Sequence, residues 1–396
     1  MGEVMIGSKA SKPVQERLWS KHFTLLVLAT TLFTGTYYLL LSVLPLHMAN
    51  LGASKVEIGF LMALFFVTSL FLRIYAGYLG DRRGRKGLLW SCVLLTLLAP
   101  LLLFFPSLSM VALAQLIFGY TIGAFTVLVI ALVTDNVSSS QVGQAIGVHS
   151  ISLVLAKGMA PALGLLIFFR FEGLSLLLVM SFSLALVTAL ILPFLKEKTV
   201  SRGGATAAPI PFRQTLRSPY VLIPGLTLFT ITFTNGAIVT MLPLFALQQA
   251  IPSFELFFVF NTVAVVVIRL FTGLLERFSS YQLIVFSLLV VAVAMVALAF
   301  ASSLPYLLLV ATLYGLGFGA MYPALTALVI EKTPAATRGS AMGVYTSFFD
   351  VGVSAGALWA GLSQFLGFQL MYLSSALLPL IGLLLFIQMK RRTSRA

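Results

Sequence analysis

Four charged residues interrupt the long apolar stretches of this sequence: Arg73, Lys157, Arg269 and Asp350. A charge near the centre of a bilayer costs on the order of 3 kcal/mol, so each of these residues needs a functional or structural reason. A carboxylate in such a place can take up and release a proton, and a cation can bind an anion. Because three cations face one acid, the embedded charge favours an anionic or zwitterionic ligand over a lipophilic cation.

The neighbours of Asp350 and Lys157 indicate where these two side chains point. Asp350 lies on a stripe of mostly small residues that recur at spacings of three and four between 339 and 360, and Lys157 lies on an equivalent stripe between 143 and 164. This spacing keeps a set of residues on one helix face, so both charges are expected to face protein or a cavity. His149 can also titrate near neutral pH, and its alternative role is that of a buried structural histidine.

The elements that position these residues are membrane helices. Hydrophobic residues make up 60% of the 396 residues and charged residues only 9%, a balance typical of chains whose solvent is mostly lipid. Apolar stretches of roughly 20 residues or more are long enough to cross a bilayer. Twelve are predicted, at about 23–49, 57–79, 88–106, 108–133, 141–168, 173–195, 220–249, 254–275, 281–302, 306–329, 340–366 and 368–389.

The chain repeats itself after 196 positions. Gly119 and Gly123 align with Gly315 and Gly319, and Arg73 aligns with Arg269. A duplicated bundle with parallel repeats places a substrate path between its halves, which points to transport. The predicted fold is an all-α membrane protein with two pseudo-symmetric bundles of six helices. We expect a cytoplasmic segment at 1–22, bundles at 23–195 and 220–389, a cytoplasmic linker at 196–219 and a cytoplasmic tail at 390–396.

The net charge of +14 is an orientation signal and does not indicate nucleic acid. Twenty of the 25 Lys and Arg residues fall on the side of the termini and the linker. Positive residues concentrate on the cytoplasmic side of membrane proteins, so both termini are expected in the cytoplasm. The expected location is the inner (cytoplasmic) membrane of a bacterium. The first 22 residues lack the pattern of a cleaved signal, so the first span is expected to remain.

The loop between the second and third spans carries the most specific motif. The run from Gly77 to Lys86 reads GYLGDRRGRK and matches in full the signature loop G-x-L-x-D-R-x-G-R-K of the major facilitator superfamily, which the chain resembles over roughly 20–390. The resemblance implies that Asp81 caps the start of span 340–366 near Gly339, and that Arg85 pairs with Asp135. The expected gating latch consists of Gly77, Asp81, Arg82, Gly84, Arg85, Lys86 and Asp135. The alternative is a loop whose cations only set topology.

The fifth span resembles the antiporter motif of the drug-efflux branch of that family. Gly147, Pro161 and Gly164 match its positions, although a role in close helix packing is an equal alternative. Segments from Leu51 to Arg73 also resemble exporters of opine-type metallophores. The resemblance therefore favours export.

The family architecture packs span 57–79 beside span 340–366, which bears on two of the embedded charges. At 1.5 Å per residue, Arg73 lies about 12 Å and Asp350 about 16 Å from the cytoplasmic ends of their helices. The sequence permits an ion pair between them or a free, proton-binding Asp350. The two possibilities are compatible if the ion pair breaks during a transport cycle.

The resemblance also implies which residues line the substrate cavity. The spans that line it in this family carry aromatic, hydroxyl and amide side chains, which suit an amphipathic small molecule. The expected cavity residues are Thr34, Tyr37, Tyr38, Gln115, Tyr120, Asn235, Tyr314, Tyr322 and Tyr345.

The predicted function is secondary active transport: a proton-coupled exporter, working by alternating access, of a small amphipathic, anionic or zwitterionic molecule. The alternatives are a proton-coupled importer of an organic anion or sugar, and a lipid flippase. No H-E-x-x-H or nucleotide-binding GK[ST] motif is present, so an enzyme is not predicted. With Cys92 as the single cysteine, no cysteine metal site is expected, and no cofactor. The expected partners are a small-molecule substrate, protons and the lipid bilayer, and a monomer is expected.

Overall fold

The computed structural model describes residues 19–138, 141–171, 173–195, 218–271, 279–334 and 338–393, without the side chains at 74, 78, 81–83, 338–340 and 389–393. The expected N-terminal segment, linker and tail therefore lie largely outside the described residues. The first half contains α1 (Lys21–Leu41), α2 (Leu44–Asn50), α3 (Lys55–Arg83), α4 (Arg85–Leu102), α5 (Leu108–Asp135), α6 (Val142–Arg170), α7 (Ser175–Ile191) and a 3-10 turn (Leu192–Phe194). The second contains α9 (Pro219–Gln248), α10 (Leu256–Leu270), α12 (Ser280–Leu298), α13 (Leu304–Lys332), α14 (Arg338–Gly361) and α15 (Ser363–Thr393).

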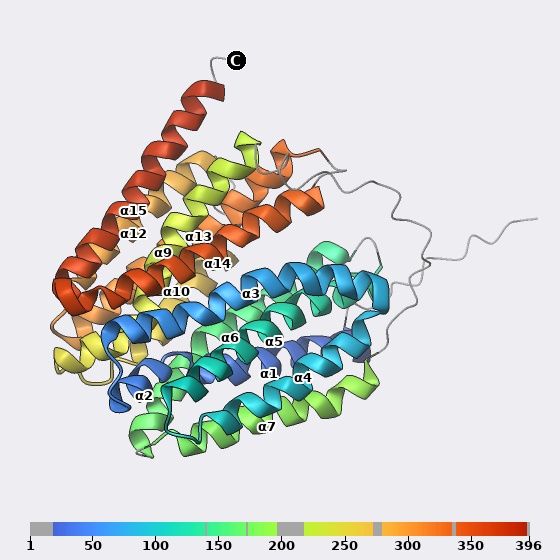
Figure 1. Ribbon diagram of the computed structural model, residues 1–396. Coiled ribbons are helices and arrows are strands. Elements are labelled where there is room, and N and C mark those ends of the chain that lie inside the picture. The colour runs from blue at the N-terminus through green and yellow to red at the C-terminus, as the bar shows by residue number, and fades with distance from the viewer. Residues whose placement is uncertain are drawn as a thin grey trace, which may run out of the picture.

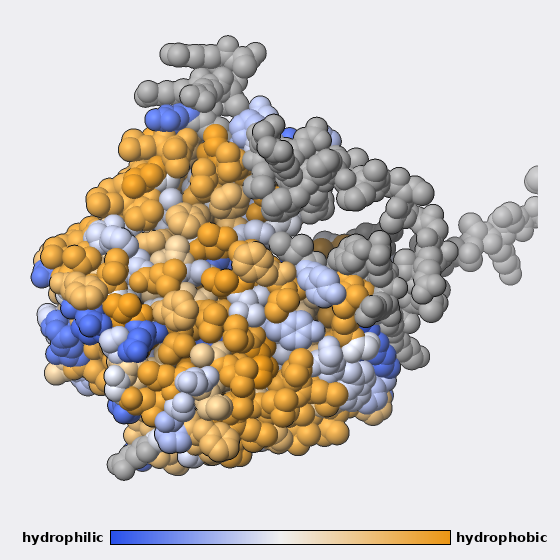
Figure 2. All heavy atoms as spheres, in the orientation of Figure 1, coloured by the Kyte–Doolittle hydropathy of each residue, from blue (hydrophilic) through white to orange (hydrophobic). Residues whose placement is uncertain are grey.

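These helices confirm the predicted all-α architecture. Each predicted span contains one described helix, except that the first is divided into α1 and α2 near Pro45, and no strand occurs among the described residues. Within the part of the chain that the structure describes, ten helical segments are long and apolar enough to cross a membrane. The other two spans correspond to α10, of which fifteen residues are described, and to α14, which is rich in glycine, alanine and serine. Apolar side chains also dominate the surface in Figure 2, as expected of a protein in lipid.

Local sequence signals set where several helices begin and end. Ser54 and Glu57 form a capping box at the start of α3, in which the Ser54 side chain accepts from the Glu57 backbone and Glu57 accepts from the Ser54 backbone. Gly84 separates α3 from α4 with φ of 92°, a backbone conformation that favours glycine. Gly367, with φ of 74°, bends the chain inside α15 in the same way.

The two halves are built alike. Helices α1 to α7 gather in one bundle and α9 to α15 in another (Figure 1). In the first half α3 packs on α5 and α1 on α6, and the repeat partners α10 on α13 and α9 on α14 pack in the same way in the second half. Glycines allow these close approaches: a side chain at Gly164 would collide with the Leu39 carbonyl, and one at Gly356 with the Phe233 carbonyl.

Two seams join the halves. Helix α3 packs against α14, and α6 packs against α10, as the internal repeat requires. Helices α3 and α14 lie together where α3 begins and α14 ends, and separate toward the end of α3 and the start of α14 (Figure 1). Gly59 permits the close end, because a side chain there would collide with the backbone of Ala357. The cavity described next lies between these seams.

Candidate functional site

A cavity of about 320 Å³ lies between the two halves. Its walls come from α1, α3, α5 and α6 on one side and from α9, α10, α13 and α14 on the other. All four embedded charges line it, as the sequence analysis expected of residues that face protein or cavity: Arg73, Lys157, Arg269 and Asp350. Its formal charge at these four positions is therefore net positive.

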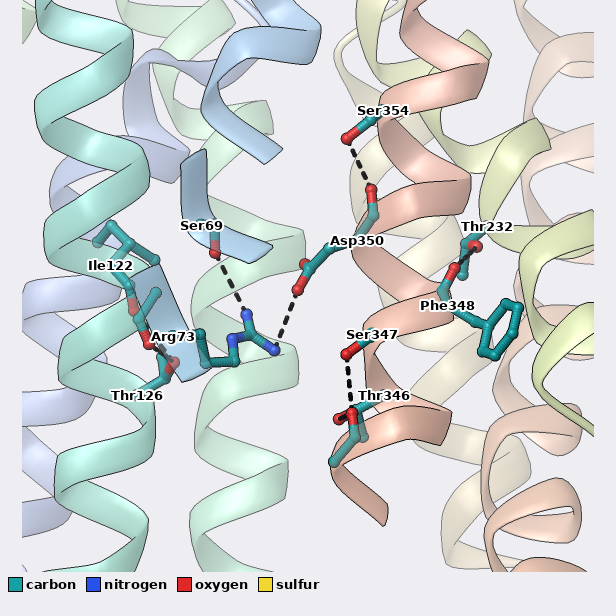
Figure 3. Close-up of polar contacts among 12 residues, drawn as sticks. Ser69, Arg73, Ile122, Thr126, Thr232, Thr346, Ser347, Phe348, Asp350 and Ser354 are labelled. Carbon is teal, nitrogen blue, oxygen red and sulfur yellow. Dashed lines mark hydrogen bonds and ion pairs between the residues drawn. The ribbon is translucent and has the colours of Figure 1, made fainter. Parts of the chain in front are cut away.

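Arg73 and Asp350 form an ion pair across the α3–α14 seam, with 3.3 Å between Nη1 and Oδ2 (Figure 3). Asp350 is only 3% exposed, whereas the Arg73 side chain is partly accessible from the cavity. Ser69, one turn before Arg73, accepts a hydrogen bond of 3.4 Å from the guanidinium. Ser354 donates to the backbone carbonyl of Asp350 and not to its carboxylate. Among the described residues, the carboxylate pairs with a cation from the other half.

The other two cations lie over aromatic rings. The Lys157 ammonium on α6 is 5.4 Å from the centre of the Tyr38 ring on α1. The Arg269 guanidinium on α10 is 6.0 Å from the centre of the Tyr322 ring on α13. Each half thus presents one cation–tyrosine contact to the cavity, in which the face of the ring attracts the positive charge.

Three of the expected cavity residues line the cavity: Tyr38, Asn235 and Tyr322. The others lie outside its lining, because their helices turn them toward neighbours in their own half. Tyr37 stacks on Phe65 with ring centres 3.8 Å apart, and Gln115 contacts the sulfur of Met62. Tyr314 shares a hydrogen bond of 3.0 Å with Thr234. Thr34 and Tyr345 are fully buried, and Tyr120 is half-buried against the core.

The cavity also includes polar residues that the sequence analysis did not select. Ser69 and Thr126 come from the first half, and Asn261 and Thr262 from α10. Ser69 and Arg73 are four residues apart, a spacing that places them on one helix face and was readable in advance. Asn261 has a buried amide oxygen without a hydrogen-bond partner among the described residues, and no sequence pattern distinguishes it.

His149 lies on α6 and does not line the cavity. It is 1% exposed, and neither ring nitrogen has a hydrogen-bond partner among the described residues. The neighbouring Ser150 does line the cavity, so a one-residue step along the helix turns His149 away from it.

The residues expected to form the gating latch gather at the end of α3. Arg85 and Asp135 form an ion pair that links the start of α4 to the end of α5. Lys86 donates a hydrogen bond of 3.3 Å to the carbonyl of Pro193. Gly77 faces Val127 on α5, and Gly84 forms the turn described above. The side chains of Asp81 and Arg82 lie outside the described residues.

The three antiporter-like positions on α6 have different surroundings. Gly164 touches the α1 backbone, whereas a side chain at Gly147 would meet nothing within 4 Å. Pro161 lines the cavity. Close packing accounts for Gly164 but leaves Gly147 without a packing role.

Side chains from both halves meet at the end of the cavity where α3 begins. The Lys55 ammonium lies 3.9 Å from the Phe368 ring centre, and the Val56 backbone donates to Gln364 over 3.4 Å. Phe169 and Phe254 make an edge contact on the α6–α10 side. These contacts close this end, while α3 and α14 separate at the other. No cluster of His, Cys, Asp and Glu suited to a metal ion occurs among the described residues.

Known proteins resemble this chain both in sequence and in fold. The sequence model of the Major Facilitator Superfamily matches residues 26–357 and 254–396. The chain is 22% identical to the staphylopine export protein of Staphylococcus aureus (strain Mu50 / ATCC 700699), covering 94% of this chain and 97% of that protein. It is 27% identical to the uncharacterized MFS-type transporter YhhS of Escherichia coli (strain K12), covering 89% and 88%. The crystal structure of the nucleoside transporter NupG shares the fold, with a TM-score of 0.78 at 13% identity, covering 93% and 99%.

Proposed function

The chain is a member of the Major Facilitator Superfamily, and we propose that it is a proton-coupled exporter of a small amphipathic molecule that carries an anionic or zwitterionic group. Its family and fold are those of membrane transporters, so it is not an enzyme. The Arg73–Asp350 ion pair supports the proposal most directly, because it joins the two halves at the wall of the cavity between them. Motion of one half against the other changes this contact.

In the proposed cycle, the carboxylate of Asp350 is the proton-binding group. Protonation of Asp350 would remove the negative charge that faces Arg73 and would weaken the ion pair that joins α3 to α14. The positive charges of the lining, with Lys157 foremost, attract the acidic group of the substrate. His149 and Asp135 are the next candidates for the coupling site.

Export is the proposed direction. A relative that covers nearly the whole chain is named as an export protein. The excess of Lys and Arg at the termini and linker supports a cytoplasmic location for both in a bacterial inner membrane. With that orientation the end where Lys55 lies over Phe368 faces outward, and the end where α3 and α14 separate faces the cytoplasm, from which the substrate would load. The proposed transporter is a monomer.

The signature loop is proposed to be the cytoplasmic latch. The Arg85–Asp135 ion pair supports this role, since it fixes the loop against α5. Asp81 would then cap α14 when the cytoplasmic ends close, favoured by the helix dipole. Asp81→Asn is expected to leave the protein abundant in the membrane and to slow transport severely. Normal turnover in a well-folded variant would remove the latch role.

Import of an organic anion or a sugar through the same cavity is the second candidate, since the fold serves both directions. Cells that lack the gene and cells that overexpress it are compared to find the metabolite retained or lost, and that compound is then offered to inside-out vesicles under an imposed pH gradient. Uptake into these vesicles with proton release supports export by antiport. Uptake only into right-side-out vesicles contradicts it and supports import.

A further inference from the structure

A second, smaller cavity of about 40 Å³ lies in the α6–α10 seam. It is lined by Ile151 and Val154 of α6 and by Val266, Arg269 and Leu270 of α10. Val154 and Arg269 also line the central cavity, so the two spaces share one wall. The seam is therefore thin at this point.

The internal repeat explains why this seam differs from the other one. An offset of 196 residues relates Arg73 to Arg269, and relates Asp350 to Val154. The α3–α14 seam is bridged by Arg73 and Asp350, whereas the corresponding place on α6 holds an apolar valine. The symmetry-related ion pair therefore cannot form across the α6–α10 seam.

The outer face of the smaller cavity is turned toward lipid. Ile151 is 41% exposed and Leu270 is 68% exposed, both apolar and both in membrane helices. From these residues inward, the lining passes from apolar side chains to the guanidinium of Arg269, and then to the central cavity. An apolar tail and an acidic head fit this order, because the tail stays beside lipid while the head meets the cation.

We propose that the α6–α10 seam is a lateral entrance through which an amphipathic carboxylate passes from the bilayer into the central cavity, with Arg269 receiving its acidic head. The inference rests on the proposed function and adds to it the route and the substrate class: one acidic head with an apolar tail. The seam must widen to admit the molecule. Because position 154 is a valine, the ion pair that Asp350 makes across the other seam has no counterpart there to oppose the widening.

Two matched variants test the entrance. The full chain is placed in phosphatidylcholine nanodiscs, and the association rate of 11-(dansylamino)undecanoate is compared with that of dansylglycine, which has the same headgroup and fluorophore without the long tail. Ile151→Trp fills the lipid-side mouth, and Leu155→Trp adds the same bulk one turn away at a position that is 44% exposed and lines neither cavity. We expect Ile151→Trp to slow the long probe about tenfold relative to dansylglycine and Leu155→Trp to leave that ratio unchanged.

A second pair of variants tests the broken symmetry. Val154→Asp places an acid where the repeat has Asp350, and Val154→Asn has the same size without the charge. An ion pair between Arg269 and the new acid would bridge the seam and should again slow the long probe selectively. An effect on the central cavity alone would instead slow both probes equally. Equal effects of Asp and Asn at this position, or of both tryptophans, would overturn the lateral route, as would a wild-type protein that does not bind the long probe.

The source of the head group is decided by adding phosphatidylglycerol to the discs. A free amphiphile keeps its association rate, whereas competition by this lipid would show that the seam binds a membrane lipid and would overturn the assignment. Proton-driven transport of the substrate found in cells is measured in the same variants. If that transport is absent from the wild type, the proposed function fails; if only the selectivity between probes is absent, the proposed function stands and the entrance fails.

Discussion

Arg73 on α3 and Asp350 on α14 meet at 3.3 Å across the boundary between the two halves, at the wall of the cavity that the halves share. Their helices lie far apart in the sequence and belong to different repeats. A contact in this place responds both to protonation and to movement of the halves.

Replacing Asp350 with asparagine is expected to abolish transport driven by a pH gradient and to preserve substrate binding, because the amide retains the shape of the carboxylate and loses its titration. Reconstituted protein in liposomes with an imposed gradient gives the first quantity, and equilibrium binding gives the second. Ser354→Ala is the control, since the Ser354 hydroxyl donates to the backbone carbonyl of Asp350 and not to its carboxylate. Uphill transport at normal rates by the Asp350 variant would exclude Asp350 from coupling.

The same variant distinguishes a structural pair from a functional one. If Asp350→Asn lowers the amount of folded protein, a lone buried Arg73 is the cause, and adding Arg73→Met should restore the yield. Restored yield together with active proton-driven transport would mean that the pair only holds α3 and α14 together.

Lys157→Met is expected to weaken binding of an anionic substrate about tenfold or more, since a charge-assisted contact contributes about 1.5–3 kcal/mol. Folding should persist, because methionine keeps an unbranched stem of similar size and removes a costly charge. Lys55→Met is the matched control: it removes a lysine that also lies over an aromatic ring, but at the closed end. Titration of the substrate into both purified variants measures the difference, and equal affinities would leave Lys157 with a structural role.

Arg85→Ala and Asp135→Asn should each impair transport, and the double variant should lose less than the sum of the two. Groups in direct contact show coupling energies of about 0.5–3 kcal/mol. Initial transport rates of the four proteins in the cycle measure that coupling. Fully additive losses would show that the ion pair between them has no part in gating.

Gly84→Ala is expected to destabilise the protein by about 1–3 kcal/mol, because the φ of 92° at this turn is unfavourable for a residue with a side chain. Gly87→Ala, three residues later inside α4, is the control, since its added methyl group would meet nothing within 4 Å. That change should be neutral or stabilising by about 0.5–1 kcal/mol. Thermal unfolding of the purified variants in detergent compares them, and a similar midpoint for both would show that the turn tolerates alanine.

The sequence by itself determined the helices and the repeat. Each span is a local apolar run whose length matches the bilayer, and lipid leaves the backbone no alternative to helix because its polar groups must be satisfied within the segment. The depth of Arg73 and Asp350 also followed from counting residues along two helices, and the ion pair that this counting permitted is present. The identity of the signature loop required only its spacing.

Only the tertiary structure decided which polar side chains face the cavity. Tyr37 and Tyr38 are adjacent and chemically identical, yet Tyr37 stacks on Phe65 inside its own half while Tyr38 lies at the cavity wall beneath Lys157. One residue along a helix is a rotation of about 100°, and the rotation of each helix about its axis is set by packing against all its neighbours. Helices that are apolar on every side carry no amphipathic stripe to fix that rotation in advance. For the same reason the sequence did not indicate the small cavity in the α6–α10 seam. The role proposed for Val154 depends on its position beside Arg269, which only the tertiary structure shows.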